Sequence, residues 1–326
     1  MVIYKMVIRI FFQQFRTIFK KVSSLLINTI FNMIRLTIFL VLILLFRNAV
    51  NGQSVSGKLL FERGKMINIV TEIKSTVTQQ AMGNAIDFTA SGLARHRYKV
   101  TAAAADHTTL QHDAYKMAFQ FEGMGQKRSF DSDNEKDMAG QFGKPVKKIL
   151  GKKYEMIIDS NGKVIKVIPE KMEIVQADER LAIVLNMLKD ITDIVYPPQK
   201  GEASFFKVLS ATETLKGESW ADSVQNETGK YKTVYTLSGI TDSTIIVDFN
   251  GTAATVSKAM MMGRETITTL NNTNSGKIIL DKATGIMKEK IINAQSHGTT
   301  EAMGGTMPVT AKSTITINVK PEQASE

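Results

Sequence analysis

Apolar and polar residues alternate with a period of two along most of the chain after residue 53. The alternation is clearest in residues 66–80, 112–122 and 314–319. One face carries Ile67, Ile69, Ile73 and Val77 in the first segment, and Tyr115, Met117, Phe119 and Phe121 in the second. Strands with one apolar and one polar face are typical of antiparallel sheets covered on one side. The sequence therefore predicts antiparallel strands of about 10 to 16 residues, which coil as their twist accumulates.

Turn residues separate several of these segments. Two Asn-Gly pairs, Asn161-Gly162 and Asn250-Gly251, each lie between two apolar segments. The flanking segments are 154–158 and 164–168 for the first pair, and 245–249 and 252–256 for the second. Asn-Gly suits the positive φ angles of a two-residue turn, so we expect a hairpin at both places. Residues 281–285 predict a longer turn between two further strands.

Residues 171–195 follow a different period. Their apolar positions are spaced alternately by three and four residues, which predicts an amphipathic helix that ends before Pro197-Pro198. These positions are Ile174, Ala177, Leu181, Val184, Leu188, Ile191 and Val195. Further apolar residues widen this face, so we expect the helix to bury more than one side against a concave sheet. A shorter helix is predicted near residues 134–142.

The predicted fold class is therefore mainly β (α+β). It is a long, strongly curved antiparallel sheet or half-barrel with one long amphipathic helix packed on it. Residues 53–326 would form a single β-rich domain. Residues 151–168 resemble residues 276–292, which leaves open that the domain consists of two similar halves, 60–170 and 200–320, joined by the helix at 171–195.

The first 52 residues have a different character. They hold seven Lys and Arg, no Asp or Glu, and an apolar run from Leu36 to Phe46. A positive segment, a short apolar core and small residues before a polar stretch predict a signal peptide that is cleaved near Gly52. The alternative is an uncleaved anchor in the inner membrane formed by residues 22–46, and translation could start at Met1 or Met33. We therefore expect export to the periplasm or outer envelope.

Charge and cysteine content exclude several classes of protein. The chain has 41 Lys and Arg against 31 Asp and Glu, but residues 53–326 have 34 against 31, so the basic character belongs largely to the leader. We therefore expect no nucleic-acid partner. Cysteine is absent from the sequence, so stability must come from the core rather than from disulfides, and thiolate metal sites and Cys nucleophiles are excluded.

Candidate catalytic and metal-binding residues form no known pattern. The four histidines, His96, His107, His112 and His297, have no metal-site spacing, and we interpret them as surface or turn residues. His112 and Asp113 are neighbours on a predicted strand, where they would point to opposite faces. The acidic residues 131–137 lack the Gly and Glu of a calcium loop. We expect no metal, no cofactor and no enzyme activity.

Methionine is frequent, and Met-Gly recurs four times. The four pairs begin at Met82, Met124, Met262 and Met303. Thioethers can bind copper(I) in exported proteins, line a pliable apolar pocket, or fill gaps in a core. We favour gap filling beside turns.

Several short motifs together resemble a known family. They are Lys216-Gly217-Glu218-Ser219-Trp220, Phe130-Asp131-Ser132, the strand–Asn-Gly–strand unit ending at Lys163–Val167, and Leu280-Asp281 with Thr284-Gly285. They occur in the same order in an exported bacterial family of unknown function, over about residues 60–320. The resemblance implies an envelope location and an antiparallel β architecture, and it carries over no catalytic residue. The layout is also similar to lipoprotein-carrier half-barrels, by architectural analogy alone.

These observations lead to two functional hypotheses. The first is an exported envelope protein that holds a hydrophobic ligand, such as a lipid acyl chain, between sheet and helix. Its candidate ligand-binding residues are Leu181, Val184, Leu188, Ile191 and Trp220. The second is a structural or protein-interaction component of the envelope without a small-molecule ligand. Its partner would be another envelope protein, and the membrane would be contacted only through an uncleaved N-terminal segment.

Overall fold

The structure is a computed structural model that describes most of the chain after residue 52. The described residues are 53–81, 84–123, 125–170, 195–226, 229–261, 264–302 and 305–321, with Arg35, Thr37 and Ile191. Gln53–Glu326 cluster as one compact unit. Its division into two similar halves stays a prediction.

Fourteen strands and two short helices are described in this unit. The strands are β1 (Ser54–Val55), β2 (Met66–Ala81), β3 (Asn84–Ala103), β4 (His107–Gly123), β5 (Gln126–Asp131), β6 (Lys153–Asp159), β7 (Val164–Ile168), β8 (Thr214–Leu215), β9 (Ser219–Asn226), β10 (Gly229–Ile240), β11 (Thr244–Met261), β12 (Arg264–Asp281), β13 (Met287–Ala302) and β14 (Gly305–Pro321). The helices are α2 (Glu135–Ala139) and α3 (Gly143–Leu150).

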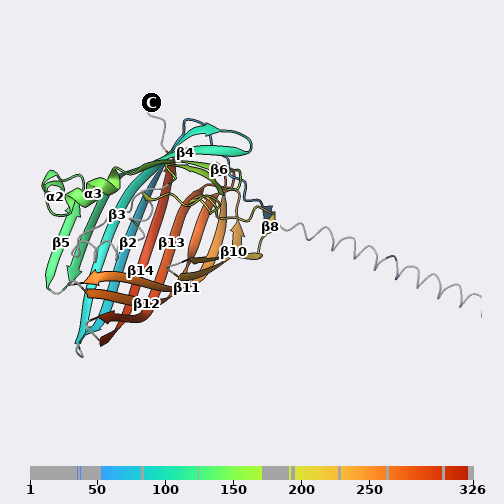
Figure 1. Cartoon of the computed structure of the whole chain (residues 1–326). Coiled ribbons are helices and arrows are strands. Elements are labelled where there is room, and N and C mark those ends of the chain that lie inside the picture. Colours follow the sequence, from blue (N-terminus) through green and yellow to red (C-terminus); the bar gives the residue numbers. More distant parts are fainter. Residues whose placement is uncertain are drawn as a thin grey trace, which may run out of the picture. The chain divides into compact units, whose positions relative to one another are not determined.

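Twelve of these strands form one antiparallel sheet. Its order is β7-β6-β4-β3-β2-β14-β13-β12-β11-β10-β9, and β5 pairs with β4 beside β6. Almost every strand pairs with its neighbour in sequence, but β2 pairs with β14, which joins the first and last long strands in the middle of the sheet. Figure 1 shows these strands side by side, bending along their length. The mainly β, antiparallel prediction is confirmed.

The strands are longer than the alternation predicts. β3 has 20 residues, which corresponds to roughly 66 Å at 3.3 Å per residue. Burial is concentrated at one end of the strands: in β14, Ile315, Ile317 and Val319 are buried, whereas Gly305 and Thr306 are exposed. We call this end the packed end of the sheet.

The predicted apolar face of β4 is only partly correct. Met117 and Phe119 are buried as expected, but Tyr115 is 42% exposed. The cause is a β-bulge, since Arg95 pairs with Lys116 while the next residue of β3, His96, pairs with Ala114. The extra residue reverses which side chains face the core on either side of it. His112 and Ala114 therefore lie in the core. His96 is also fully buried, so the prediction that His96 and His112 are surface or turn residues is wrong.

One of the two predicted Asn-Gly hairpins is wrong. Asn161-Gly162 does turn the chain between β6 and β7, with Gly162 at φ +84°. Asn250-Gly251 instead lies inside β11, which continues to Met261. There Gly251 pairs with Thr233 on one side and Asn274 on the other, so pairing with two neighbouring strands outweighs the local turn preference. The longer turn after Asp281 is confirmed.

The helical predictions have different outcomes. The short helix near 134–142 is replaced by α2 and α3, and the Asn134 side chain caps α2 by accepting hydrogen bonds from two backbone N–H groups. The long helix at 171–195 lies outside the described residues, apart from Ile191, which is helical, and Val195; both are buried in the core. Among the helices that are described, none has the length and apolar character needed to span a bilayer.

Candidate functional site

Two hollows lie at the packed end of the sheet, on either side of a cluster of aromatic rings. The first, the apolar hollow, has a volume of about 290 Å³. Its apolar lining consists of Leu60, Phe61, Met66, Ile67, Val100, Ile286, Met287 and Val319. The second, the histidine hollow, has a volume of about 340 Å³ and is lined by His96, Tyr98, Tyr154, Tyr196, Pro197, Pro198, Ala203 and Phe205.

The segment before β2 closes one side of the apolar hollow. Backbone hydrogen bonds join Leu59 N to Ser160 O at 2.7 Å and Leu60 N to Thr284 O at 2.9 Å. These bonds attach the segment to the β6–β7 turn and to the β12–β13 turn. Leu60 remains half exposed, so an apolar side chain stands at the mouth of the hollow.

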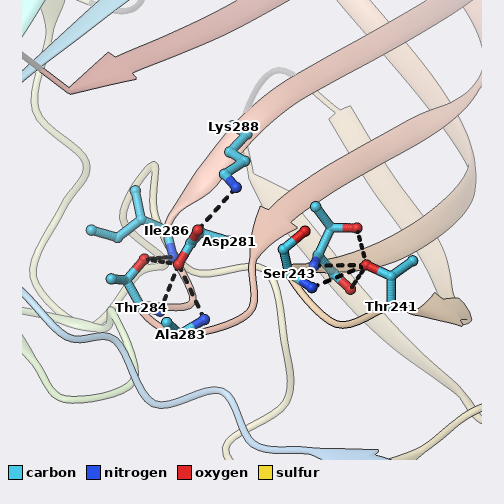
Figure 2. Close-up of polar contacts among 8 residues, drawn as sticks. Thr241, Ser243, Asp281, Ala283, Thr284, Ile286 and Lys288 are labelled. Atoms are coloured by element: carbon cyan, nitrogen blue, oxygen red, sulfur yellow. Dashed lines mark hydrogen bonds and ion pairs between the residues drawn. The ribbon is translucent and has the colours of Figure 1, made fainter.

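The β12–β13 turn positions the charged rim of the apolar hollow (Figure 2). The Asp281 carboxylate accepts hydrogen bonds from the N–H groups of Ala283 and Thr284 and from the Thr284 hydroxyl, at 2.9–3.1 Å. It also pairs with Lys288 Nζ at 2.9 Å. Partial burial opposes ionisation, but the bonds from Lys288 and Thr284 outweigh it and lower the pKa of Asp281. The turn therefore places Ile286 and Lys288 at the hollow.

Aromatic rings separate the two hollows. Phe206 is fully buried and lies edge-on to Phe61 on one side, with ring centroids 5.2 Å apart, and to Tyr98 on the other, at 5.1 Å. Phe205 stacks on Tyr98 at 6.3 Å. Such ring pairs contribute beyond their buried area, so this wall between the hollows is well packed.

One member of a buried histidine pair, His96, lines the second hollow. His96 comes from β3 and His112 from β4, and both are fully buried. His112 lies opposite Tyr98 on one side and Tyr154 on the other. His96 Nδ1 and His112 Nε2 are 2.9 Å apart, which is a hydrogen bond between the two rings. The hydroxyls of Tyr98 and Tyr154 are hydrogen-bonded at the same distance.

Burial keeps both imidazoles neutral. Loss of water, together with the neighbouring His112, lowers the pKa of His96 to about 3, and loss of water lowers the pKa of His112 to about 3. Burial also raises the pKa of Tyr98 to about 12. At neutral pH the cluster therefore contains two neutral imidazoles and two neutral phenols.

Each histidine has one nitrogen that forms no hydrogen bond with the residues that the structure describes. Among the described residues, His96 Nε2 and His112 Nδ1 have no partner. Two neutral rings share two protons, and one of these lies in the bond between the rings. The pair therefore offers one N–H donor at one outer nitrogen and one lone pair at the other. Exchange of tautomers in both rings would reverse these roles.

The structure describes only two of the five predicted ligand-binding residues, Ile191 and Trp220. Leu181, Val184 and Leu188 are outside the described residues. Ile191 is buried in the core, and Trp220 is the second residue of β9, where it stacks on Tyr235 with ring centroids 5.6 Å apart. Neither lines the two hollows. The role of these five residues stays a prediction.

Other sequence candidates have structural roles or lie outside the structure. Met82, Met124, Met262 and Met303 are outside the described residues. Asp131, the last residue of β5, and Asp133, in the loop after it, both pair with Lys116 of β4. Within the part of the chain that is described, no group of three His, Asp or Glu side chains is arranged to hold a metal ion.

The histidine pair was not predicted from the sequence. His96 and His112 are 16 residues apart on two strands joined by a short turn. This spacing was the signal in the sequence that the two residues could meet across a hairpin. Their contact also depends on the bulge at Tyr115, which the alternation pattern does not locate.

Comparison with known proteins gives a partial family match. Residues 200–287 match the model of a family described as a family of unknown function (DUF6263). This region contains the Lys216–Trp220 motif, in which Gly217 adopts φ +93° before β9 begins. No curated protein matches the sequence.

The solved structures that match this chain are distant from it. A structure of lipovitellin, described in terms of lipid–protein interactions, matches 82% of this chain with 9% identity and a TM-score of 0.43, and this chain spans about a quarter (26%) of its length. Ail of Yersinia pestis matches 79% of the chain and 100% of its own, with 8% identity and a TM-score of 0.18. An outer membrane channel of Pseudomonas putida F1 matches 81% of this chain over 98% of its own length, with 7% identity and a TM-score of 0.19. At these TM-scores the likenesses support no functional assignment.

Proposed function

We propose that this is an exported, non-enzymatic envelope protein that holds the acyl chain of a lipid in the apolar hollow. The observation that carries the proposal is the hollow itself. Its floor is formed by Ile67, Val100 and Met287, which are almost fully buried, and its mouth by the half-exposed Leu60. The leader predicted at residues 1–52 supports export.

The size and polarity of the hollow suit a chain of medium length. A volume of 290 Å³ holds about ten groups the size of water, each of which occupies roughly 30 Å³ in the liquid. Each buried CH₂ contributes about 0.8 kcal/mol before the costs of association. The apolar lining is surrounded by two acidic and two basic residues, Glu62, Asp281, Lys65 and Lys288. A polar headgroup would therefore remain in water, beside charges of both signs.

The apolar rim gives a direct test. Leu60→Asp is expected to weaken the binding of decanoate about tenfold, because a half-buried leucine contact worth roughly 1.4 kcal/mol is replaced by a hydrated carboxylate. The measurement is calorimetric titration of the purified full-length protein. Val256→Asp is the matched control, since Val256 is 45% exposed on β11 and does not line the hollow.

Equal decanoate affinity in the two variants would contradict the proposed location. Native mass spectrometry of protein purified from membranes should in addition show lipid adducts, which Leu60→Asp should reduce. A consistent absence of adducts together with no decanoate binding would leave the structural or protein-interaction role. Cell fractionation and N-terminal sequencing test export, with a mature terminus expected near Gln53.

A further inference from the structure

We propose that the histidine hollow is a second binding site, which takes a neutral aromatic ring carrying a hydroxyl or carbonyl group that hydrogen-bonds to His96. The site is separate from the apolar hollow, so it does not depend on the proposed acyl-chain function. Three features of the hollow lead to this ligand: its aromatic walls, its unpartnered buried nitrogen and its lack of charge.

The walls of the histidine hollow suit a flat ring. Tyr98 and Tyr154 come from two strands of the sheet, and Tyr196 and Phe205 come from the loop after the segment 171–195. Pro197 and Pro198 add a wall of rigid backbone. Aromatic side chains offer stacked and edge-on contacts to another ring at little cost in conformational entropy.

The buried nitrogen supplies the specific contact. His96 is fully buried and lines the hollow, and its Nδ1 is already bonded to His112. Its Nε2 has no partner among the described residues. A buried polar atom without a partner destabilises the folded protein, so a ligand group that bonds Nε2 would stabilise it.

The tautomers of the histidine pair decide which groups can bind. When His96 carries its proton on Nδ1, Nε2 is an acceptor and suits a hydroxyl. When His112 donates to His96 instead, His96 Nε2 carries the proton and suits a carbonyl. Phenols and quinones therefore both fit, and the protein adapts by moving two protons between nitrogens without a change of net charge.

The absence of charge excludes ionic ligands. None of the described residues that line the histidine hollow is acidic or basic apart from His96. Burial holds both histidines in their neutral forms. A carboxylate or ammonium group would lose its hydration in this hollow without gaining a partner of opposite charge.

Matched pairs of small probes test this site. Menadione and 2-methylnaphthalene differ in the two carbonyls, and 2-naphthol and naphthalene differ in one hydroxyl. We expect the protein to bind the oxygenated member of each pair about tenfold more tightly in equilibrium dialysis. His96→Phe retains an aromatic ring of similar size and should bind both members of each pair equally. Circular dichroism and urea unfolding verify that this variant is folded.

A second measurement uses the unmodified protein. In ¹⁵N NMR spectra, the ring nitrogens of His96 should shift when menadione or 2-naphthol is added, and not when either hydrocarbon is added. Equal affinities within each pair, or unchanged His96 signals at saturation, would overturn the proposal. Excess decanoate should not displace menadione. Displacement would show that menadione occupies the apolar hollow, and this result would also overturn the proposal.

Discussion

Lowering the pH from about 7.5 to about 5 is expected to reduce the free energy of unfolding by about 4 kcal/mol, through His96 and His112. Both are buried, and both have a pKa of about 3 in the folded protein against an ordinary value of 6.5. At pH 5 the unfolded chain binds about one proton at each residue, whereas the folded protein binds almost none. Each histidine therefore favours unfolding by about 2 kcal/mol at that pH.

The direction of this effect follows from the sign of the pKa shift. A histidine with a lowered folded-state pKa contributes fully to stability above pH 6.5, and this contribution is lost as the pH falls toward 3. Urea unfolding at a series of pH values measures it. His297→Gln is the control, because His297 is exposed on β13. Its replacement should leave the decrease in the free energy of unfolding unchanged. A free energy of unfolding that stays constant between about pH 7.5 and pH 5 would show that the pair is not buried as described.

Gly276→Ala is expected to destabilise the protein by about 3 kcal/mol or more. Gly276 lies on β12 between Phe249 of β11 and Ile292 of β13. A Cβ atom at this position would lie 1.9 Å from the carbonyl oxygen of Ile291 and 2.7 Å from the ring of Phe249. The first contact is with backbone, so relief requires one strand to move inside the sheet.

Ser275→Ala is the matched control for this variant. Ser275 is the preceding residue of β12 and is exposed, so its substitution should change stability by no more than about 0.5 kcal/mol. Both variants can be compared by thermal or urea unfolding. If Gly276→Ala unfolds at the same urea concentration as Ser275→Ala, the close approach of Phe249 and Ile291 to this glycine is wrong.

Local patterns in the sequence were sufficient for the type of fold. The alternation in β2 and β14 reports directly which side of each strand is buried, because the period of two belongs to every strand. The turn at Asn161-Gly162 and the cap at Asn134 also depend on nearby residues alone. These elements could therefore be located from the sequence to within a few residues.

Features that depend on a partner strand could not be predicted in this way. Asn250-Gly251 has the same letters as the hairpin at Asn161-Gly162, yet it stays extended because β10 and β12 pair on both sides of it. The bulge at Tyr115 is defined by the register between β3 and β4. The His96–His112 contact follows from that register, so the main feature of the histidine hollow is a property of the pairing rather than of either strand.

The pairing of β2 with β14 has a consequence for biosynthesis. Residue 73 meets residue 315, so β2 leaves the ribosome long before its partner has been made. Until the last strand is translated, one edge of the nascent sheet has unpaired N–H and C=O groups, and such edges promote aggregation. Contacts so distant in sequence also slow folding. A chaperone that shields this edge during synthesis should therefore raise the yield of soluble protein, and removal of β14 should leave a chain that aggregates.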